Sequence, residues 1–575
     1  MTEQMRTKAD VLVIGGSCSG LIAAIRIKET NKELDVAVVD KGYIGKVGSA
    51  HYSGGDFLLF LPGVHDRDAW MRQFIEAGGY LADQEWVKLH LQESYPIFCD
   101  LLAWGVPAKG QEYDYYLQEE GFLFRNIEGQ DILCRSGVKM GNAAKLVTRK
   151  FLPALRKKAR ESGVRLFSHM MVTDLLQEGE RICGAVGFER RTGEFHLFEA
   201  KATIIATGSM GFKGGGCGIG FITGDGMAMS YRCGAEIVHA EFLVGCHRTG
   251  LKSLDTAYAH VFGGNYLNRL GHPIEDSLVT KAHHTGELNK CLEMAKQHHA
   301  GLGPFYIDLS LEDAKARIDR VREQLQRPED VGMPVLLTLE RAGIDVRTST
   351  GKVEITLFHQ GAMGHGGIRV DKNCRSQLEA LYVSGDSAGV LLSSSHWGSG
   401  LASAAVTGNI AGKNAAKYAE TINHISLNPS NIQRLKERTF EALHRNKGFS
   451  PDEATLMVQK AILPYDVQIV RHGKRLQTAL KEIERLRDDV LPNLKATDLH
   501  DLVKVHEVRN MALCAEITLR TSLFRKESRI PTFYREDYPE RDDENWLKWT
   551  VTKEKHGRME VSEESVPFGQ YEFKP

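Results

Sequence analysis

Three glycines and one aspartate near the start of the sequence have the types and the spacing that bind a dinucleotide. Gly15, Gly16 and Gly20 form a glycine-rich run, and Asp40 stands twenty residues beyond the last of them. Gly15 would allow a tight turn, and Gly20 would let a helix pack closely on a strand. Ser17 occupies the usual second-glycine position, where Gly16 beside it would allow close approach to a pyrophosphate. Asp40 would accept hydrogen bonds from the ribose hydroxyls of adenosine.

The elements that must position these residues are a strand, a turn and a helix. An apolar run over residues 9–14 precedes the glycines, an alanine-rich run over 21–26 follows them, and a second apolar run over 36–39 ends at Asp40. This order predicts a βαβ unit whose helix N-terminus presents N–H groups to a phosphate. The alternative is a βαβ unit that binds no ligand, and glycine-rich motifs elsewhere in the chain disfavour it.

The layout of the other glycine-rich turns favours FAD over a nicotinamide cofactor. The nucleotide-binding pattern stops near residue 235 and returns near residue 365, so a long cofactor could lie across both segments. The run from Gly42 to Gly55 could place backbone N–H groups against an isoalloxazine edge. Its alternative interpretation is a flexible loop.

Length and composition set bounds on the class of protein. A chain of 575 residues exceeds what one hydrophobic core organises, so we expect two or three domains. Lys and Arg (73) nearly balance Asp and Glu (74), which disfavours nucleic-acid binding. The ten cysteines include no CxxC pair, so no iron–sulfur or zinc cradle is expected. No apolar run reaches the roughly 20 residues of a membrane span, and we expect a reduced, cytoplasmic protein.

The expected fold class is α/β. A Rossmann-type FAD-binding domain is interrupted by an α+β capping domain and followed by a C-terminal helical domain. The expected boundaries are 1–235 and 361–425 for the two parts of the FAD-binding domain, 236–360 for the capping domain, and 426–575 for the helical domain with an extended tail.

Several elements within these domains are also predicted. A hairpin-like stretch is expected to include residues 195–198, and a separate strand follows over 202–206. Helical periods are clearest at 430–446, 467–489 and 500–525, whereas the polar last fifty residues are expected to extend over the surface.

The chain resembles the flavoprotein subunits of the succinate dehydrogenase and fumarate reductase superfamily. That superfamily also contains L-aspartate oxidase and the adenylylsulfate reductase α subunit. The resemblance covers most of the chain. Its motifs are the glycine turn with Asp40, Ser49–Gly55, Ala206-Thr207-Gly208, Thr223–Met229 with Gly234 and Glu241-Phe242, Gly366-Gly367-Ile368, Leu381–Asp386, Glu527-Ser528-Arg529, Arg535–Pro539 and Asp542–Trp546.

The resemblance implies FAD, a mobile cap over the isoalloxazine, and an iron–sulfur partner subunit. In many members the Thr-Gly-Asp-Gly turn and the later Gly-Asp lie against the flavin, which makes Asp225 and Asp386 cofactor candidates. The expected cofactor-binding residues are Gly15, Gly16, Ser17, Ser19, Gly20, Asp40, Lys41, Gly48, Ser49, Ser53, Gly54, Gly55, Ala206, Thr207, Gly208, Thr223, Asp225, Gly385, Asp386, Ser399, Gly400 and Leu401.

The substrate motifs of the dicarboxylate members do not carry over. Gly48 stands where those members have a histidine that in some attaches FAD, with His51 three residues on, so a non-covalent FAD is expected. The family's Arg-Gly-Glu-Gly-Gly is replaced by residues 260–264, which read His-Val-Phe-Gly-Gly, and its His-Pro-Thr is absent. Paired arginines clamp a dicarboxylate by bidentate bonds that a neutral histidine cannot reproduce. Succinate and fumarate are therefore disfavoured.

Four side chains are the candidates for substrate chemistry. His396 lies in a segment that resembles the adenylylsulfate reductase branch, where a histidine faces the flavin, although that branch's arginine-rich substrate segment is not clearly matched. His260 stands at the position of the family's proton-donating arginine, and His247 and Arg248 follow the lost His-Pro-Thr motif. Histidine suits proton control at neutral pH. The adjacent pairs His283-His284 and His298-His299 are interpreted as solvated helix, so no metal site is predicted.

Two functional hypotheses follow. The first is an FAD-dependent oxidoreductase that moves a hydride or electron pair between a small-molecule substrate and FAD, and passes electrons to an iron–sulfur partner. The second is an electron-relay subunit that has lost its own substrate, which the missing arginines favour. The glycine turns disfavour a flavin-free scaffold.

Overall fold

The structure is a computed structural model of the 575-residue chain. It describes residues 4–53, 55–63, 65–109, 121–125, 131–135, 144–146, 148–214, 220–242, 247–251, 266–274, 286–308, 351–359, 366–390, 399–423, 425–529 and 533–575.

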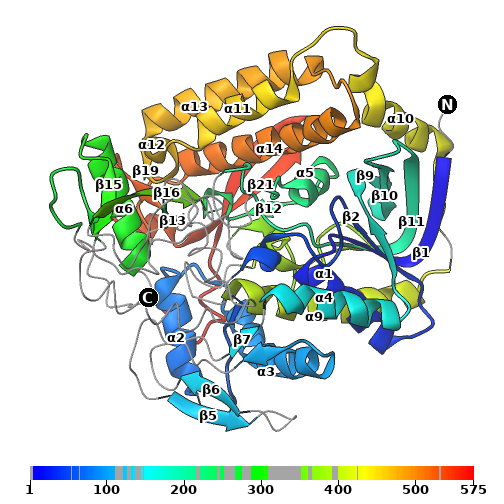
Figure 1. The fold of residues 1–575 in the computed structure, drawn as a ribbon, viewed down its shortest axis with the longest axis horizontal. Coiled ribbons are helices and arrows are strands. Elements are labelled where there is room, and N and C mark those ends of the chain that lie inside the picture. Colours follow the sequence, from blue (N-terminus) through cyan, green and yellow to red (C-terminus); the bar gives the residue numbers. More distant parts are fainter. Residues whose placement is uncertain are drawn as a thin grey trace.

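The largest sheet of the described residues has seven strands and lies toward the right of Figure 1. Its parallel part contains β8 (Arg165–Ser168), β2 (Val36–Asp40), β1 (Gln4–Ile14) and β11 (Phe195–Ile205), with β18 (Leu381–Val383) also pairing with β11. Two antiparallel strands, β10 (Arg181–Glu189) and β9 (Met170–Glu178), continue from β11. The apolar runs of β1 and β2 are fully buried because helices and strands cover both faces of the sheet. The predicted Rossmann-type α/β class is confirmed.

One strand is longer than the sequence pattern predicted. The expected hairpin stretch 195–198 and the expected strand 202–206 form a single eleven-residue strand, β11. It pairs with β1 along its whole length, from Gln4 opposite Phe195 to Ile14 opposite Ile205. The polar residues between the two apolar runs misled the prediction, because pairing on both sides keeps the backbone extended through them.

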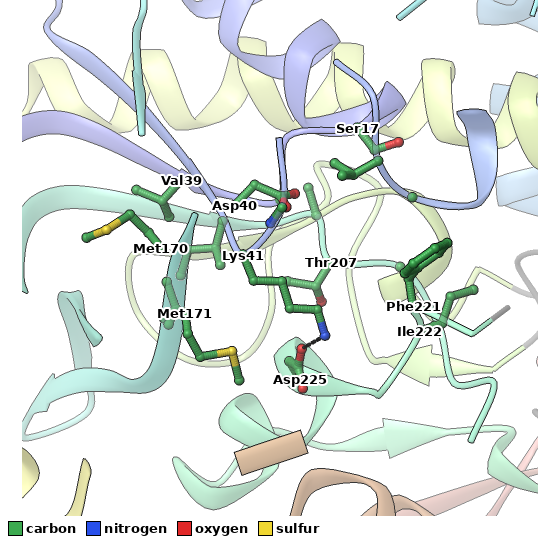
Figure 2. Close-up of a pocket in the computed structure, with 18 of the residues that line it drawn as sticks. Ser17, Val39, Asp40, Lys41, Met170, Met171, Thr207, Phe221, Ile222 and Asp225 are labelled. Atoms are coloured by element: carbon green, nitrogen blue, oxygen red, sulfur yellow. Dashed lines mark hydrogen bonds and ion pairs between the residues drawn. The ribbon is translucent and has the colours of Figure 1, made fainter. Parts of the chain in front are cut away.

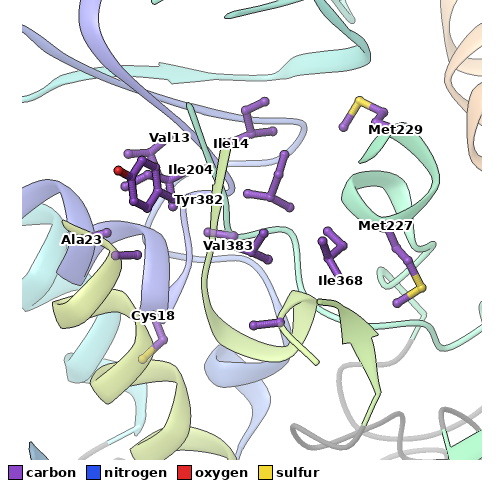
Figure 3. Close-up of a cluster of buried hydrophobic side chains, with 14 of the residues drawn as sticks. Val13, Ile14, Cys18, Ala23, Ile204, Met227, Met229, Ile368, Tyr382 and Val383 are labelled. Carbon is purple, nitrogen blue, oxygen red and sulfur yellow. The ribbon is translucent and has the colours of Figure 1, made fainter. Parts of the chain in front are cut away.

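Two helices, α1 (Cys18–Thr30) and α9 (Ser399–Glu420), pack on one face of the sheet (Figures 1 and 3). Their approach requires glycine: a Cβ at Gly408 would lie 2.6 Å from the carbonyl oxygen of Ser19. On the other side lies α5 (Asp225–Arg232), whose Met227 and Met229 project toward the core (Figure 3). Helix α1, near the start of the chain, thus packs closely against α9, which belongs to the second predicted FAD-binding segment.

A smaller antiparallel sheet lies within the segment predicted as the cap. Its strands, in spatial order, are β13 (His247–Leu251), β16 (Lys352–His359), β15 (Phe305–Asp308) and β14 (Tyr266–Leu267). Helix α6 (Gly286–His299) belongs to the same segment. The boundaries 235/236 and 360/361 stay predictions.

The C-terminal region is rich in helices. They are α10 (Pro429–Phe440), α11 (Pro451–Ile462), α12 (Tyr465–Gln468), α13 (Gly473–Arg485) and α14 (Leu499–Phe524). Of these, α11, α13 and α14 lie side by side (Figure 1). Helix α14 is buried over most of its length and packs against α13, α11 and α5. It therefore joins the C-terminal region to the FAD-binding fold.

The tail does not simply extend over the surface, and that prediction is wrong for its first part. Arg529 and Arg535 are about as buried as core residues, at 1% and 2% exposure. Each is ion-paired, Arg529 with Glu527 at 2.7 Å and Arg535 with Asp537 at 2.8 Å. A polar composition misled the prediction because paired charges can be buried where unpaired ones cannot. The later tail forms a hairpin, β21 (Lys548–Lys555) and β22 (Arg558–Ser565), that joins β12 (Ile237–Val238) and β17 (Gly367–Ile368).

The remaining elements surround this frame. They are the helices α2 (Arg67–Ala77), α3 (Gln84–Ala103), α4 (Thr148–Glu161) and α15 (Asp543–Trp546), the short strands β3 (Asp56–Phe57), β4 (Ala108–Lys109), β5 (Gly121–Arg125), β6 (Asp131–Arg135), β7 (Ala144–Leu146), β19 (Val470–Arg471) and β20 (Tyr534–Arg535), and several single helical turns, including Ser49–Tyr52, Ala240–Phe242 and Glu441–His444. Among the described helices, none combines the length and the apolar character of a membrane span.

Candidate functional site

A cavity of about 720 Å³ opens where β1, β2 and β11 end and α1 begins (Figure 2). This is the edge of a parallel sheet at which doubly wound folds bind ligands. Figure 2 shows Met170, Met171 and Val39 toward one end of the cavity, and Ser17 and Phe221 toward the other. Residues from several elements, far apart in sequence, therefore line the cavity.

The glycine turn forms the part of the cavity wall nearest the sheet. Gly15 has φ +117°, and a Cβ there would lie 2.2 Å from the carbonyl oxygen of Ala206. A Cβ at Gly20 would lie 1.9 Å from the carbonyl oxygen of Gly15. No other residue type fits these two positions, and the close packing leaves the first N–H groups of α1 available to a phosphate at the helix N-terminus.

Asp40 lies at the end of β2 with both carboxylate oxygens bonded to backbone. The N–H of Gly16 donates to Oδ2 and the N–H of Gly42 donates to Oδ1, each at 2.7 Å. Burial raises the pKa of Asp40, and these two N–H groups oppose that rise. The carboxylate is held in place at the cavity, and each oxygen keeps further lone pairs for a ligand hydroxyl.

Lys41 forms the centre of a charged cluster on the cavity wall. Its Nζ donates to Thr223 Oγ1 at 2.7 Å and to Glu507 Oε1 at 2.7 Å. It also donates to Asp225 Oδ2 at 2.8 Å, the interaction drawn in Figure 2. Burial alone would lower the pKa of Lys41, but Asp225 and Glu507 outweigh it and raise the pKa above its ordinary value. Lys41 is therefore a fixed cation. Thr223 supports this lysine and does not itself line the cavity.

Two buried polar atoms on the cavity wall have no partner among the described residues. They are the hydroxyl oxygen of Ser17 and Oδ1 of Asp386. Burial raises the pKa of Asp386 to about 7. Buried polar atoms of native proteins are normally hydrogen-bonded, so both atoms fit a bound ligand that offers hydroxyl or N–H groups.

Gly48 lies close to Ser17 and leaves no room for a side chain. Its φ is +81°, and a Cβ there would lie 2.6 Å from the hydroxyl oxygen of Ser17. The helical turn Ser49–Tyr52 follows, and the ring of Tyr52 stacks on Phe221 with a centroid separation of 5.6 Å. Neither a histidine nor any other side chain fits at position 48 in this backbone.

Sequence reasoning missed one wall of the cavity. Beside Met170 and Met171 of β9, the wall contains residues from the first turns of α14: His500, Val503, Lys504 and Glu507. Their spacing of three and four residues places them on one helix face. That spacing was visible in the sequence, but a charged helix face usually faces solvent, so only the fold could reveal the contact.

The structure brings together most of the predicted cofactor residues. Those that line the cavity are Gly15, Ser17, Ser19, Asp40, Lys41, Gly48, Ser49, Ala206, Thr207, Gly208, Asp225, Gly385 and Asp386. Those that are described but do not line it are Gly16, Gly20, Ser53, Gly55, Thr223, Gly400 and Leu401. Gly54 lies outside the described residues, and the side chain of Ser399 is not described.

The structure does not describe the side chains of the four predicted catalytic residues. His260 and His396 lie outside the described residues. His247 and Arg248 are in β13, where the backbone pairs them with His359 and Phe358 of β16. Within the described part of the chain, no group of histidine, cysteine and acidic residues has the arrangement of a metal site.

The fold and the cavity define a flavin-binding class of protein, and comparison with known families agrees. The FAD binding domain family matches residues 10–406, more than two thirds of the chain. The C-terminal domain of fumarate reductase flavoproteins matches residues 459–575. The chain belongs to the FAD binding domain family and is an FAD-dependent oxidoreductase flavoprotein.

Three relatives are similar to this chain over nearly its whole length. A fumarate reductase (CoM/CoB) subunit from Methanothermobacter marburgensis is 27% identical, covering 93% of this chain and 95% of that protein. A fumarate reductase flavoprotein subunit from Mycobacterium tuberculosis is 28% identical, covering 97% of each chain. An uncharacterised FAD-dependent oxidoreductase of Methanocaldococcus jannaschii is 27% identical over 97% of this chain and 99% of that protein.

Solved structures share the fold over nearly the whole chain. A quinol–fumarate reductase chain superposes with a TM-score of 0.82 at 19% identity, covering 98% of both chains. An adenosine-5-phosphosulfate reductase chain superposes with a TM-score of 0.80 at 19% identity, covering all of this chain and 98% of the other. The predicted resemblance to the fumarate reductase flavoproteins is confirmed, and the adenosine-5-phosphosulfate reductase chain shares the fold.

Proposed function

We propose that this chain is the flavoprotein subunit of a redox enzyme that exchanges an electron pair between a small substrate and non-covalent FAD, and passes electrons to an iron–sulfur partner. The observation that supports it best is the cavity of about 720 Å³ whose wall combines the glycine turn, a fixed carboxylate and two polar atoms without a partner among the described residues. FAD would supply the two-electron chemistry when bound.

The residues present fit FAD. The N-terminal N–H groups of α1 would hold the pyrophosphate, and Asp40 would accept from the adenosine ribose. Ser17 and Asp386 would bond to hydroxyl or N–H groups further along the cofactor, because their polar atoms lack a protein partner. Lys41 would offset the negative charge of the cofactor from the cavity wall.

Gly48 supports the non-covalent mode. It stands where the dicarboxylate members carry a histidine, and its backbone has no space for a side chain beside Ser17. Acid precipitation of the purified protein tests this point. Yellow colour that stays in the supernatant agrees with the proposal, colour retained in the pellet contradicts the non-covalent mode, and a colourless protein that takes up no FAD contradicts the cofactor assignment.

The substrate is proposed to differ from succinate and fumarate, although relatives are named for fumarate. The supporting observation is the sequence at positions 260–264, where a histidine replaces the family's proton-donating arginine. We further propose that His396 manages the proton at the flavin, with His260, His247 and Arg248 as other candidates around the substrate.

An anaerobic assay tests the substrate proposal. FAD-loaded enzyme, dithionite-reduced or oxidised, is mixed with fumarate, succinate or adenylylsulfate and the flavin spectrum is followed. Rapid electron exchange between the flavin and fumarate or succinate would contradict the proposal that neither acid is the substrate. His396→Asn should lower the substrate-dependent rate by about 100-fold or more, whereas the exposed His444→Asn should leave it unchanged.

A second function, an electron relay between protein partners, is favoured by the same missing arginines. It predicts no flavin response to any of these small molecules but rapid exchange with a co-purified iron–sulfur protein. In that case the His396→Asn variant would retain the exchange rate.

A further inference from the structure

The charged cluster around Lys41 joins three parts of the chain that are far apart in sequence. Lys41 directly follows β2, Lys213 lies in the loop after β11, and Glu507 belongs to α14 in the C-terminal region. Glu507 Oε1 accepts from Lys41 Nζ at 2.7 Å, and its Oε2 pairs with Lys213 Nζ at 2.5 Å. One carboxylate therefore ties together two loops that form different parts of the cavity wall.

The burial of this cluster makes it more than a surface ion pair. The Glu507 side chain is 9% exposed, and the side chains of Lys41 and Lys213 are 23% and 24% exposed. Burial alone would raise the pKa of Glu507, but the two lysines outweigh it and hold the pKa well below its usual range. Glu507 is thus ionised whenever the protein is folded near neutral pH. Removing its charge would leave Lys41 with its ion pair to Asp225 and would take from Lys213 the ion pair that it makes with Glu507.

The neighbouring charges on the same helix face are engaged elsewhere. Lys504, which also lines the cavity, pairs with Asp452 at 2.8 Å and with Asp501 at 3.7 Å rather than with an acid of the cluster. Asn510 supports the cluster from the next turn, since its Nδ2 donates to Asp225 Oδ1 at 2.9 Å. Glu507 is the α14 side chain that holds both lysines.

The position of the cluster relates it to one half of the cofactor. In this fold the acid at the end of the second strand receives the adenosine ribose, and here that acid is Asp40, adjacent to Lys41. In Figure 2 Asp40 and Lys41 lie between Met170 and Met171 on one side and Phe221 and Ser17 on the other. The cluster is therefore beside the adenosine half.

We infer that Glu507 is a positioning residue for the adenosine half of FAD: by holding Lys41 and Lys213 it makes cofactor retention depend on the C-terminal helix α14. The inference rests on the proposed FAD site and adds to it a residue from outside the FAD-binding fold. It implies that the affinity of the protein for FAD and for ADP alone falls together when Glu507 is changed.

The test compares Glu507→Gln with a matched change on the same helix, Glu516→Gln. Glu516 is also buried, 3% exposed, and pairs with two arginines, Arg487 and Arg520, but it does not line the cavity. Deflavinated protein is titrated with FAD and separately with ADP. Glu507→Gln should weaken both by the same factor, about tenfold or more, while Glu516→Gln stays within about twofold of wild type.

A potential measurement separates positioning from general loosening. The reduction potential of bound flavin in Glu507→Gln should equal that of the wild type, because the inferred role of Glu507 concerns the adenosine half of FAD and not the isoalloxazine. A shifted potential, equal losses in both glutamine variants, or unchanged FAD and ADP affinity in Glu507→Gln would each overturn the inference. Wild-type protein that binds neither ligand would instead contradict the proposed FAD site.

Lys213→Met supplies a second variant if Glu507→Gln does not fold. It leaves the Glu507–Lys41 bond intact and should weaken FAD and ADP by about threefold or more; binding within about twofold of wild type overturns the inference. When both single variants fold, the double variant Lys213→Met with Glu507→Gln should bind FAD no more weakly than Glu507→Gln alone. If the loss of FAD affinity in the double variant equalled the product of the two single losses, Lys213 and Glu507 would act separately.

Discussion

Gly48 combines a left-handed backbone with a close neighbour, and the two effects can be separated. A side chain there would meet both the positive φ of +81° and the Ser17 hydroxyl at 2.6 Å. Gly105 has the same φ, but a Cβ there would have nothing within 4 Å, so this glycine isolates the backbone effect.

We predict that Gly48→Ala lowers the free energy of unfolding by about 1–2 kcal/mol more than Gly105→Ala. Urea denaturation of the deflavinated proteins measures the difference. Equal losses would mean that the Ser17 contact relaxes at no cost. Gly48→His should also fail to create a covalent flavin, which acid precipitation of the FAD-loaded variant would show.

Asp386 makes the stability of the cofactor-free protein depend on pH. Burial raises its pKa from 3.8 to about 7, so the folded state binds a proton more tightly than the unfolded state does. Its contribution to the free energy of unfolding therefore falls as pH rises from 3.8 toward 7, and it is at its lowest above pH 7.

We predict that Asp386→Asn removes this dependence. Between pH 5 and pH 8 the deflavinated wild type should lose about 2 kcal/mol more stability than the variant, since partial exposure reduces the full value of the shift. Urea titrations at a series of pH values measure it, and parallel curves would contradict the assignment. The variant should bind FAD more weakly, because its amide replaces a carboxylate acceptor.

At the scale of elements, the buried arginines attach the tail to the start of the predicted cap. Arg525 is fully buried and pairs with Glu241 at 2.8 Å and with Glu527 at 2.7 Å. Glu241 lies in the helical turn Ala240–Phe242, and its Oε2 also accepts from the hydroxyl of Thr550 in β21. Helix α14, the cap entry and the tail hairpin thus meet at one ionic network.

Arg525→Met should lower the free energy of unfolding by about 3–5 kcal/mol, because it leaves the buried Glu241 carboxylate without its ion-pair partner, while Glu527 keeps Arg529. The comparison variant is Arg541→Met, whose pair with Asp543 is 39% and 42% exposed, and which should lose less than about 1 kcal/mol. Chemical denaturation of the two variants tests this, and similar losses would show that the network adds nothing beyond a surface pair.

At the scale of the whole molecule, Tyr465 of α12 links the small antiparallel sheet to the helical region. Its hydroxyl lies 2.8 Å from Thr356 Oγ1, accepts from the N–H of Leu357 at 3.2 Å and donates to the Leu357 carbonyl at 3.1 Å. Lys296 of α6 lies 4.3 Å above the ring of Tyr534 nearby. The segment predicted as the cap is thus joined to the C-terminal region as well as to the FAD-binding fold.

Tyr465→Phe should speed amide hydrogen exchange in β15 and β16 by about fivefold, because it removes hydrogen bonds worth about 1 kcal/mol in total. Tyr418→Phe, which removes one bond to Glu379 at a different surface, should leave these amides unchanged. Equal exchange in all three proteins would show that this hydroxyl does not restrain the sheet.

Local pattern was sufficient for the N-terminal unit of this protein. Strand β1, the turn at Gly15 and Gly20, helix α1 and Asp40 are all encoded within forty residues, so their periodicity and spacing predicted a dinucleotide-binding βαβ unit. The choice of FAD came from the later glycine-rich turns and the family motifs. The departures at Gly48 and at positions 260–264 were equally visible, because a lost motif is read directly from residue types.

Only the tertiary structure decided which distant residues complete the site. Glu507 is separated from Lys41 by 466 positions, and its helix face resembles a solvated one until α14 is packed against the cavity. Tertiary partners also explain the two wrong predictions, the separate strands within β11 and the surface position of the arginines. The polar residues of β11 stay extended because neighbouring strands pair with them, and the arginines are buried because carboxylates pair with them. Residue types and spacing determined what this protein binds, and the packing of α14 decided which residues surround the bound cofactor.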